Sequence, residues 1–521
     1  MEKQLNLVLK LSLNEMALRR VAVNLWSESL ILAAMQRVRK FDQGSSIISR
    51  VVWEKILDWV KEKVSELVLP ESLKERMMHL VRPVGREIVR WKLFHEYILN
   101  DISDEDFDIR TLEQLCWTCT GAVDYRKTSE ELVRLEILDI EKRYRLACLY
   151  CLEDYIPVLW VELPEKYKRR FNDEAYPLPE SMVHLEYYWA SVLKGEEFKL
   201  NDILPREFVD VSSTYQSYFK YSACEGSKAA TEYFFQKLTN EERNNALYGA
   251  LCAVLERATR LYHLSDVQEK PRSDVFCYLL SLMTREQRMQ VFKKHPSGCL
   301  IFFLDWPWQD LCLDITVQIW NFLPESQYDY VLDKLENNIF ISCYFFPDLF
   351  QKFFIHSPSS FRKYFVDHEC RYEIFPFFSD FVDVEDAETI KVVLGNLDSG
   401  YRMRLLSNNR FFNLLFVLMS RDKWHLVELC VGEAMLSEKD REILKEAYMG
   451  FHTRDRRDGQ WKWFFARICS EDKWKRFFEL LDGTSTSTPS TKCSEDETLR
   501  PKLRDSIHGE KYDSSKKLKR L

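Results

Sequence analysis

The chain has 521 residues, more than a single globular core usually holds, so we expect several domains or one extended array. Hydrophobic residues make up 46% of the chain, while 14 Gly and 16 Pro are too few for the tight turns of an all-β protein. The net charge of −8 argues against general binding to nucleic acid or to acidic membrane surfaces.

The first clear element is a helix over residues 51–67. Apolar residues recur there every three or four positions and charged residues occupy the opposite face, which is the pattern of an amphipathic helix. Leu69-Pro70-Glu71 then predicts the start of the next helix, because Pro fits a first turn and the helix dipole favours Glu. The apolar face comprises Trp53, Ile56, Leu57, Val60, Val64 and Leu67.

Copies of this Leu-Pro-Glu tripeptide suggest related helical units in the N-terminal half. They stand at 69–71, 163–165, 178–180 and 323–325. Breaks between helices are expected at 99–111, 171–182 and 194–228, and the last of these shows no clear helix stripe. The predicted divisions are an N-terminal helical module (1–195), a linker (196–228), a helical-repeat array (229–482) and a disordered tail (483–521).

Two cysteine pairs are the main candidates for chemistry. Cys116 with Cys119 and Cys148 with Cys151 could together hold a tetrahedral zinc ion. Both pairs, however, lie in apolar segments whose sequence is typical of helices, where residues three positions apart merely share a face. We therefore prefer buried structural cysteine, with zinc binding or a redox dithiol as the alternatives.

The remaining polar motifs predict no catalytic residue and no cofactor. The acidic run from Asp101 to Asp108 lacks the glycine and terminal glutamate of a calcium loop, so we expect a solvated loop that caps the next helix. The ten histidines are scattered singly, and no phosphate loop or nucleophile motif is present.

A short phrase repeats through the C-terminal half and marks helix starts. It consists of an apolar residue, then Pro, Ser, Thr or Asp, with an Arg or Tyr five residues after the apolar one. A period near 40 that restarts a helix each time is typical of a stacked helical array. The copies lead from Leu238 to Arg243, Met283 to Arg288, Leu323 to Tyr328, Leu397 to Arg402 and Leu436 to Arg441, with a degenerate copy at Ser357-Pro358.

Aromatic residues concentrate between 302 and 381, where 23 of 80 residues are Phe, Tyr or Trp. We favour the interpretation that these aromatic side chains lie in the core of adjoining repeats, where large rings fill the space between helices. A concave surface whose exposed aromatics grip a partner is the alternative, and the sequence does not decide between them.

The C-terminal region carries three weaker signals. The arginine-rich loop 452–459, followed by two Trp, could contact nucleic acid, but its aspartates and the acidic body disfavour this. Residues 483–521 have few apolar side chains and should be disordered. A basic stretch, Lys516 to Arg520, is a weak nuclear-import-like patch.

The compartment is predicted from what the sequence does not contain. No apolar run approaches the roughly 20 residues of a membrane span, and the charged N-terminus does not read as a signal peptide. The 14 cysteines are spread through helical text, as in a reducing environment. We expect a cytoplasmic protein, with the nucleus as the alternative.

The segment Tyr144–Trp160 resembles the paired helices of ankyrin-like proteins, with a small-residue helix feeding a second helix. The Thr-Pro-Leu-His signature of ankyrin repeats is absent. The chain as a whole resembles uncharacterised, lineage-expanded helical-repeat proteins of arthropods, a resemblance that implies no known activity. Its period is nearer to that of HEAT or armadillo pairs, an analogy of architecture.

The sequence thus predicts an all-α protein, an α-solenoid of stacked helical pairs. We expect it to be non-enzymatic and to bind protein partners through an extended surface, as a scaffold or adaptor. The alternative is an enzyme or metal protein whose site lies near the two cysteine pairs. Partner identity, biological process and oligomeric state cannot be predicted from these patterns.

Overall fold

The computed structural model describes residues 9, 11–38, 46–99, 108–171, 183–209, 213–261, 272–337, 347–369, 386–455 and 471–483. Every regular element in these residues is helical, and the β pairing among them is one isolated bridge between Trp117 and Val123. The all-α class is therefore confirmed. Contacts divide the chain into two compact units, Met1–Ser470 and Glu471–Leu521.

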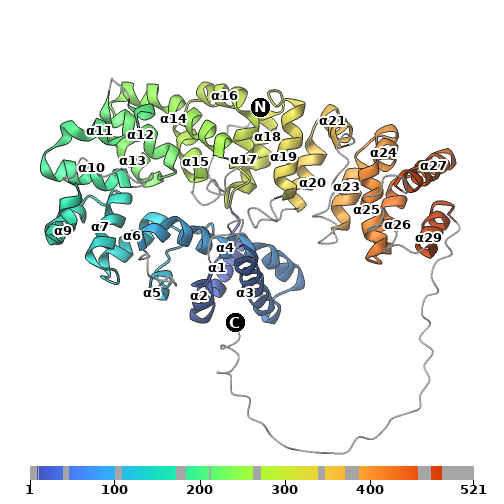
Figure 1. The fold of residues 1–521 in the computed structure, drawn as a ribbon, viewed down its shortest axis with the longest axis horizontal. Coiled ribbons are helices and arrows are strands. Elements are labelled where there is room, and N and C mark those ends of the chain that lie inside the picture. Colours follow the sequence, from blue (N-terminus) through green and yellow to red (C-terminus); the bar gives the residue numbers. More distant parts are fainter. Residues whose placement is uncertain are drawn as a thin grey trace, which may run out of the picture. The chain divides into compact units, whose positions relative to one another are not determined.

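The helices of the first unit follow one another from α1 to α27, and most of them are labelled in Figure 1. Up to residue 261 they are α1 (Leu13–Trp26), α2 (Ser29–Met35), α3 (Ser46–Glu66), α4 (Glu71–Leu99), α5 (Ile109–Leu112), α6 (Tyr125–Arg134), α7 (Ile140–Leu149), α8 (Ile156–Glu162), α9 (Glu165–Lys168), η1 (Arg169–Phe171), α10 (Val183–Lys194), η2 (Glu197–Lys199), α11 (Leu200–Ile203), η3 (Arg206–Phe208), α12 (Thr214–Glu225), α13 (Lys228–Lys237) and α14 (Asn240–Leu261).

The chain continues with helices of similar length. They are α15 (Arg272–Leu282), α16 (Arg285–Lys294), α17 (Pro296–Phe302), η5 (Trp308–Leu311), α18 (Cys312–Ile319), α19 (Glu325–Asn337), α20 (Pro347–His356), α21 (Ser359–Glu369), α23 (Ala387–Gly395), α24 (Ser399–Leu406), α25 (Asn409–Ser420), α26 (Trp424–Glu433) and α27 (Glu438–Asp455). Among its described residues, the second unit holds α29 (Glu471–Leu481).

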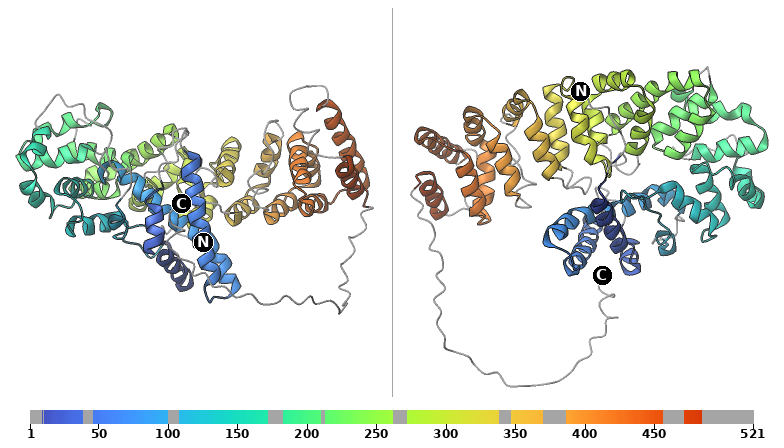
Figure 2. Two further views of the ribbon diagram at one scale, coloured as in Figure 1. Left: turned by 60° about the horizontal axis from the view of Figure 1, so that its bottom comes forward. Right: turned by 180° about the vertical axis from the view of Figure 1, so that it is seen from behind.

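Helices α1, α3 and α4 pack together around two tryptophans, and Figures 1 and 2 show the three side by side. Trp26 stacks on Trp53 with ring centroids 5.5 Å apart, and the Trp26 indole N–H donates to the Val81 carbonyl at 2.7 Å. The predicted apolar face of 51–67 is buried from Trp53 to Val64, as its spacing indicates.

The repeated phrase marks helix starts, as predicted. Helices α14, α16, α19, α21, α24 and α27 each begin within two residues of a copy. At α16 the Thr284 hydroxyl accepts from the Gln287 amide while the Gln287 side chain accepts from the Thr284 amide, a complete capping box. The Asp398 carboxylate caps α24 by accepting from the Tyr401 backbone amide, without the reciprocal bond of a capping box.

The arginine of the phrase has a structural role that its position explains. Arg243 donates to the Phe235 and Gln236 carbonyls at the end of α13, and Arg362 donates to the Ile355 carbonyl at the end of α20. Arg402 reaches Glu433 and Ala434, where α26 ends. The last carbonyls of a helix have no partner inside it and carry partial negative charge, so a cation satisfies both needs.

The predicted linker over 196–228 contains a buried helix, so the break between helices expected over 194–228 is wrong for 214–225. Helix α12 packs against α13 and α14, and Tyr218 and Phe219 are fully buried. Because every residue from Ser217 to Glu225 except Lys220 is buried, buried residues lie on all sides of this part of the helix and no single apolar stripe stands out.

The described aromatic residues of 302–381 are mostly core. Tyr328 stacks on Phe353 and Phe361 at centroid distances of 5.7 and 5.2 Å, and all three side chains are buried. Phe302 stacks on Phe276 in the same manner. The aromatic runs at 344–346 and 377–378 lie outside the described residues, as do the loop 456–459 and residues 484–521 of the tail.

Candidate functional site

The two cysteine pairs occupy different kinds of structure. Cys116 and Cys119 lie between α5 and α6, in a turn closed by the Thr118 and Ala122 backbones, so the expectation that this pair is helical is wrong. Gly121, with φ of +74°, supplies the left-handed residue of that turn. Cys148 is in α7 and Cys151 lies two residues after the end of that helix, and both of these are buried.

Burial makes the second pair poor thiolates. It raises the pKa of Cys151 to about 12 and the pKa of Cys148 well above its usual value. Among the described residues, no three Cys, His, Asp or Glu side chains gather in a way that could hold a metal ion. The acidic run contributes Asp108, which caps α5 by accepting from the Arg110 amide, and its other members lie outside the described residues.

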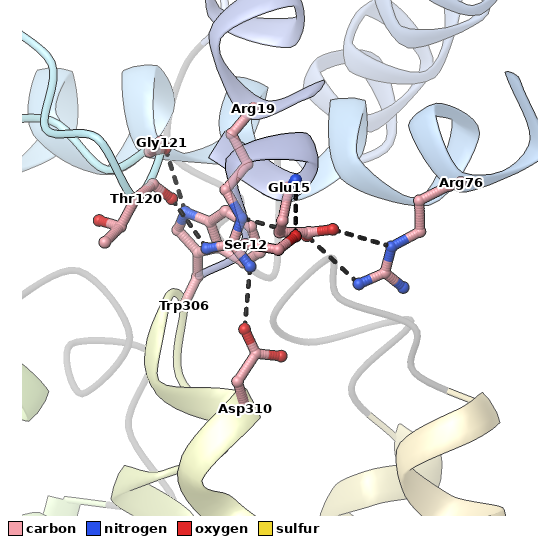
Figure 3. A network of polar contacts seen from close by, with 8 residues as sticks. All are labelled: Ser12, Glu15, Arg19, Arg76, Thr120, Gly121, Trp306 and Asp310. Carbon is pink, nitrogen blue, oxygen red and sulfur yellow. Dashed lines mark hydrogen bonds and ion pairs between the residues drawn. The ribbon is translucent and has the colours of Figure 1, made fainter. Parts of the chain in front are cut away.

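A polar network joins the N-terminal helices to a segment almost 300 positions later (Figure 3). Arg19 of α1 donates to the Thr120 carbonyl and to Asp310, each at 3.0 Å. Its guanidinium lies 4.4 Å from the ring centroid of Trp306, whose indole N–H donates to the Gly121 carbonyl at 3.1 Å. Arg19 is only 2% exposed, so this cation is bound inside the protein.

The network also binds Glu15, one turn before Arg19 on α1. Glu15 accepts from the Arg19 Nε at 3.2 Å and from Arg76 of α4 at 3.3 Å. The Glu15 amide in turn donates to the Ser12 hydroxyl, which caps α1. Arg19 therefore has a fixed side-chain direction, set by a carboxylate on its own helix.

A second arginine reaches the same segment from α4. Arg90 donates to Asp305 at 2.5 Å, and Asp305 also accepts from the Ser273 hydroxyl at 2.7 Å. Arg90 lies 3.6 Å from Glu87 of its own helix, and Glu87 accepts from the Val123 amide at 3.3 Å. We call residues Asp305–Asp310 the 305–310 turn, and both of its end carboxylates bind arginines of the N-terminal helices.

Glu87 is a buried carboxyl of this cluster with a shifted pKa. Its side chain is 4% exposed, and burial together with nearby Asp305 and Asp274 raises its pKa to about 7 in spite of Arg90. Asp274, which accepts from the Trp308 indole at 2.8 Å, also has a raised pKa because it is buried. A carboxyl of this kind exchanges its proton near neutral pH, and so is a functional candidate.

A polar groove lies elsewhere, between α12 and α14. It has a volume of about 520 Å³, with small residues on α14 and polar side chains along both helices. A Cβ added to Gly249 would meet no atom within 4 Å, so the groove is open at this point. Its lining consists of Gln216, Lys220, Glu241, Glu242, Asn245, Ala246, Gly249 and Ala250.

Neither feature follows from the sequence motifs. The groove residues have no unusual spacing, and Arg19 and Glu87 stand in ordinary helical text. In the sequence, Trp306-Pro307-Trp308 of the 305–310 turn stands out only as part of the aromatic-rich stretch 302–381.

Comparison with known proteins adds no family. No protein-family model matches the chain, and no curated protein is significantly similar to it. No helix among the described residues is both long and apolar enough to cross a bilayer. The class that can be stated is an all-α protein, and its function has to be argued from its own surfaces.

Proposed function

We propose that the protein is a non-enzymatic helical-repeat scaffold that binds an extended segment of a partner protein in the α12–α14 groove. The groove is the observation that carries this proposal, because it is open at Gly249 and is lined on α14 by the small residues Ala246, Gly249 and Ala250. An extended peptide needs small residues in its binding site, since its backbone must approach the receptor closely. The stacked arrangement of helical pairs is part of the proposal.

The chemistry of the lining favours a peptide over a small apolar ligand. Asn245 and Gln216 carry side-chain amides, which can donate and accept as a peptide group does. Lys220 adds one positive charge and Glu241 and Glu242 add two negative charges, so a partner segment with more bases than acids in register would be favoured. Small-molecule pockets are usually more apolar than this.

The thiols support a cytoplasmic setting for this function. The ten described cysteines are all free, and eight of them are buried. Unpaired thiols persist in reducing compartments, so we propose the cytoplasm, with the nucleus as the alternative.

A glycine substitution tests the binding site. Gly249→Arg places a long side chain in the groove, and we expect it to abolish cross-linking to a reproducible partner set, with at least a ten-fold loss by quantitative mass spectrometry. Gly432→Arg on α26 is the matched control, because Gly432 is also a helical glycine whose added Cβ would meet nothing within 4 Å. Identical partner sets for the wild type and both variants would refute the assignment of the groove.

A further inference from the structure

The contact between the N-terminal helices and the 305–310 turn depends on a small number of charges. Arg19 binds Asp310 at one end of the turn and Arg90 binds Asp305 at the other. The backbone of residues 120–123 lies between them, accepting from Arg19 at Thr120 and from Trp306 at Gly121. Three segments far apart in sequence therefore meet at these two arginines.

Arg90 has more carboxylates to neutralise than one cation can. Glu87 faces it from α4, Asp305 from the turn and Asp274 from α15, and the phenol of Tyr125 on α6 lies near Glu87 as well. Lys228 of α13 is a second cation that acts on Asp274, which leaves Glu87 and Asp305 to Arg90. Asp305 has the short contact with Arg90, while Glu87 stands 3.6 Å away with one oxygen hydrogen-bonded to no group. When Glu87 carries a proton, the positive charge of Arg90 and the negative charge of Asp305 cancel. When Glu87 ionises, the buried cluster gains a negative charge that no cation compensates.

We propose that Glu87 is a proton-controlled latch: protonated, it keeps the 305–310 turn bound to α4 and to residues 120–123, and its ionisation loosens that contact. The latch is a property of the fold and is independent of what binds in the α12–α14 groove. Its direction is set by charge balance, so the turn is held at low pH and released as pH rises.

The sign follows from the two states of the carboxyl. In the closed state the pKa of Glu87 is about 7, whereas an exposed glutamic acid titrates at 4.5. Stability from the raised pKa is fully present below the lower value and is lost as pH rises through the higher one. Between pH 5.5 and 8.5 the opening equilibrium should therefore increase about 30-fold.

Hydrogen exchange measured by mass spectrometry on the full chain tests the latch. The probes are peptides covering 116–124 and 299–311, and the reference peptides cover α23 to α26. Intrinsic exchange scales equally with pH in both sets, so their ratio isolates local opening. We expect protection of the probes relative to the reference to fall about 30-fold between pH 5.5 and 8.5 in the wild type.

Glu87→Gln, which mimics the protonated acid, should hold the ratio constant over this range. A wild-type ratio that does not change with pH overturns the proposal, and this measurement does not require that the variant folds. Equal pH dependence in the wild type and Glu87→Gln also overturns it, because another group would then be responsible. Loss of protection in the reference peptides to the same extent would show global unfolding and would count against a local latch.

Discussion

Two glycines show how a single hydrogen atom in place of a methyl group can be required or dispensable. A Cβ on Gly85 of α4 would lie 2.1 Å from Trp26, while one on Gly249 of α14 would lie in open space. The first glycine lets the Trp26 ring lie against the α4 backbone and donate to Val81. The second costs helix stability and leaves room in the groove.

Gly85→Ala should lower the free energy of unfolding by about 3 kcal/mol, because Trp26 must move away and lose its hydrogen bond and its stacking on Trp53. Gly249→Ala should raise the free energy of unfolding by about 0.5–1 kcal/mol through helix propensity alone. Urea denaturation followed by circular dichroism measures both. Destabilisation by both substitutions would show that the space around Gly249 is not open.

Cys148 distinguishes a structural thiol from a reactive one. Cys148 is fully buried and its thiol pKa is raised by that burial, so we expect slow reaction with a thiol reagent in the native state. Cys148→Ser should lower the thermal midpoint by several degrees, because a hydroxyl replaces an apolar thiol. Rapid labelling of Cys148 in the folded protein, together with unchanged stability of the serine variant, would revive the redox or metal hypothesis.

At the scale of helices, the repeated phrase is a device that ends one helix and starts another. Its polar second residue caps the new helix, and its arginine binds the carbonyls at the end of a neighbouring one. The positions of these helix starts could be predicted because caps and Pro are local signals. The role of the arginine could not, because its partners lie up to 32 residues away.

Arg402→Met should lower the free energy of unfolding by about 2 kcal/mol, since the carbonyls of Leu397, Glu433 and Ala434 lose a charged donor. Arg288→Met is the matched control, because Arg288 has the same place in its copy of the phrase but its side chain makes no hydrogen bond or ion pair with a described residue. We expect the control to change stability by less than about 0.5 kcal/mol. Equal losses for both variants in chemical denaturation would contradict the capping role.

Burial on all sides limits what can be predicted for individual helices. The helix over 51–67 can be predicted from its sequence because one face is buried and the other is charged. Helix α12 cannot be predicted in this way, because Tyr218, Phe219 and Glu225 are buried on different sides of it. The turn at Cys116–Val123 is also not predictable from local pattern, because its apolar residues have a spacing that fits a helix. The positive φ of Gly121 and the hydrogen bond from the Ala122 amide to the Thr118 hydroxyl form a turn there instead.

For the molecule as a whole, the class was predictable and the long-range contacts were not. Composition and the low number of Gly and Pro residues predict an all-α chain, which the structure confirms for the described residues. Arg19 and Asp310 are 291 positions apart, and no local pattern connects them. The solenoid, its period and its divisions stay predictions.

Arg19→Met should lower the free energy of unfolding by about 3 kcal/mol, because the part-buried Thr120 carbonyl loses its donor and the buried cation no longer covers Trp306. Asp310→Asn should cost less than about 1 kcal/mol, since Asp310 is 47% exposed and its charge is screened. Thermal and urea denaturation of both variants and of the double variant give the coupling. A larger loss for Asp310→Asn than for Arg19→Met would contradict this division of the energy.

The separation of Arg19 from Asp310 also governs the order in which the protein assembles during its synthesis. At about 5–20 residues per second, a ribosome needs about 15–60 seconds to add the 291 residues between them. Throughout that interval Arg19 of the nascent α1 lacks Asp310, and Arg90 of α4, once it is added, lacks Asp305. Any truncated product that stops before residue 305 emerges with that binding surface open to water or to chaperones.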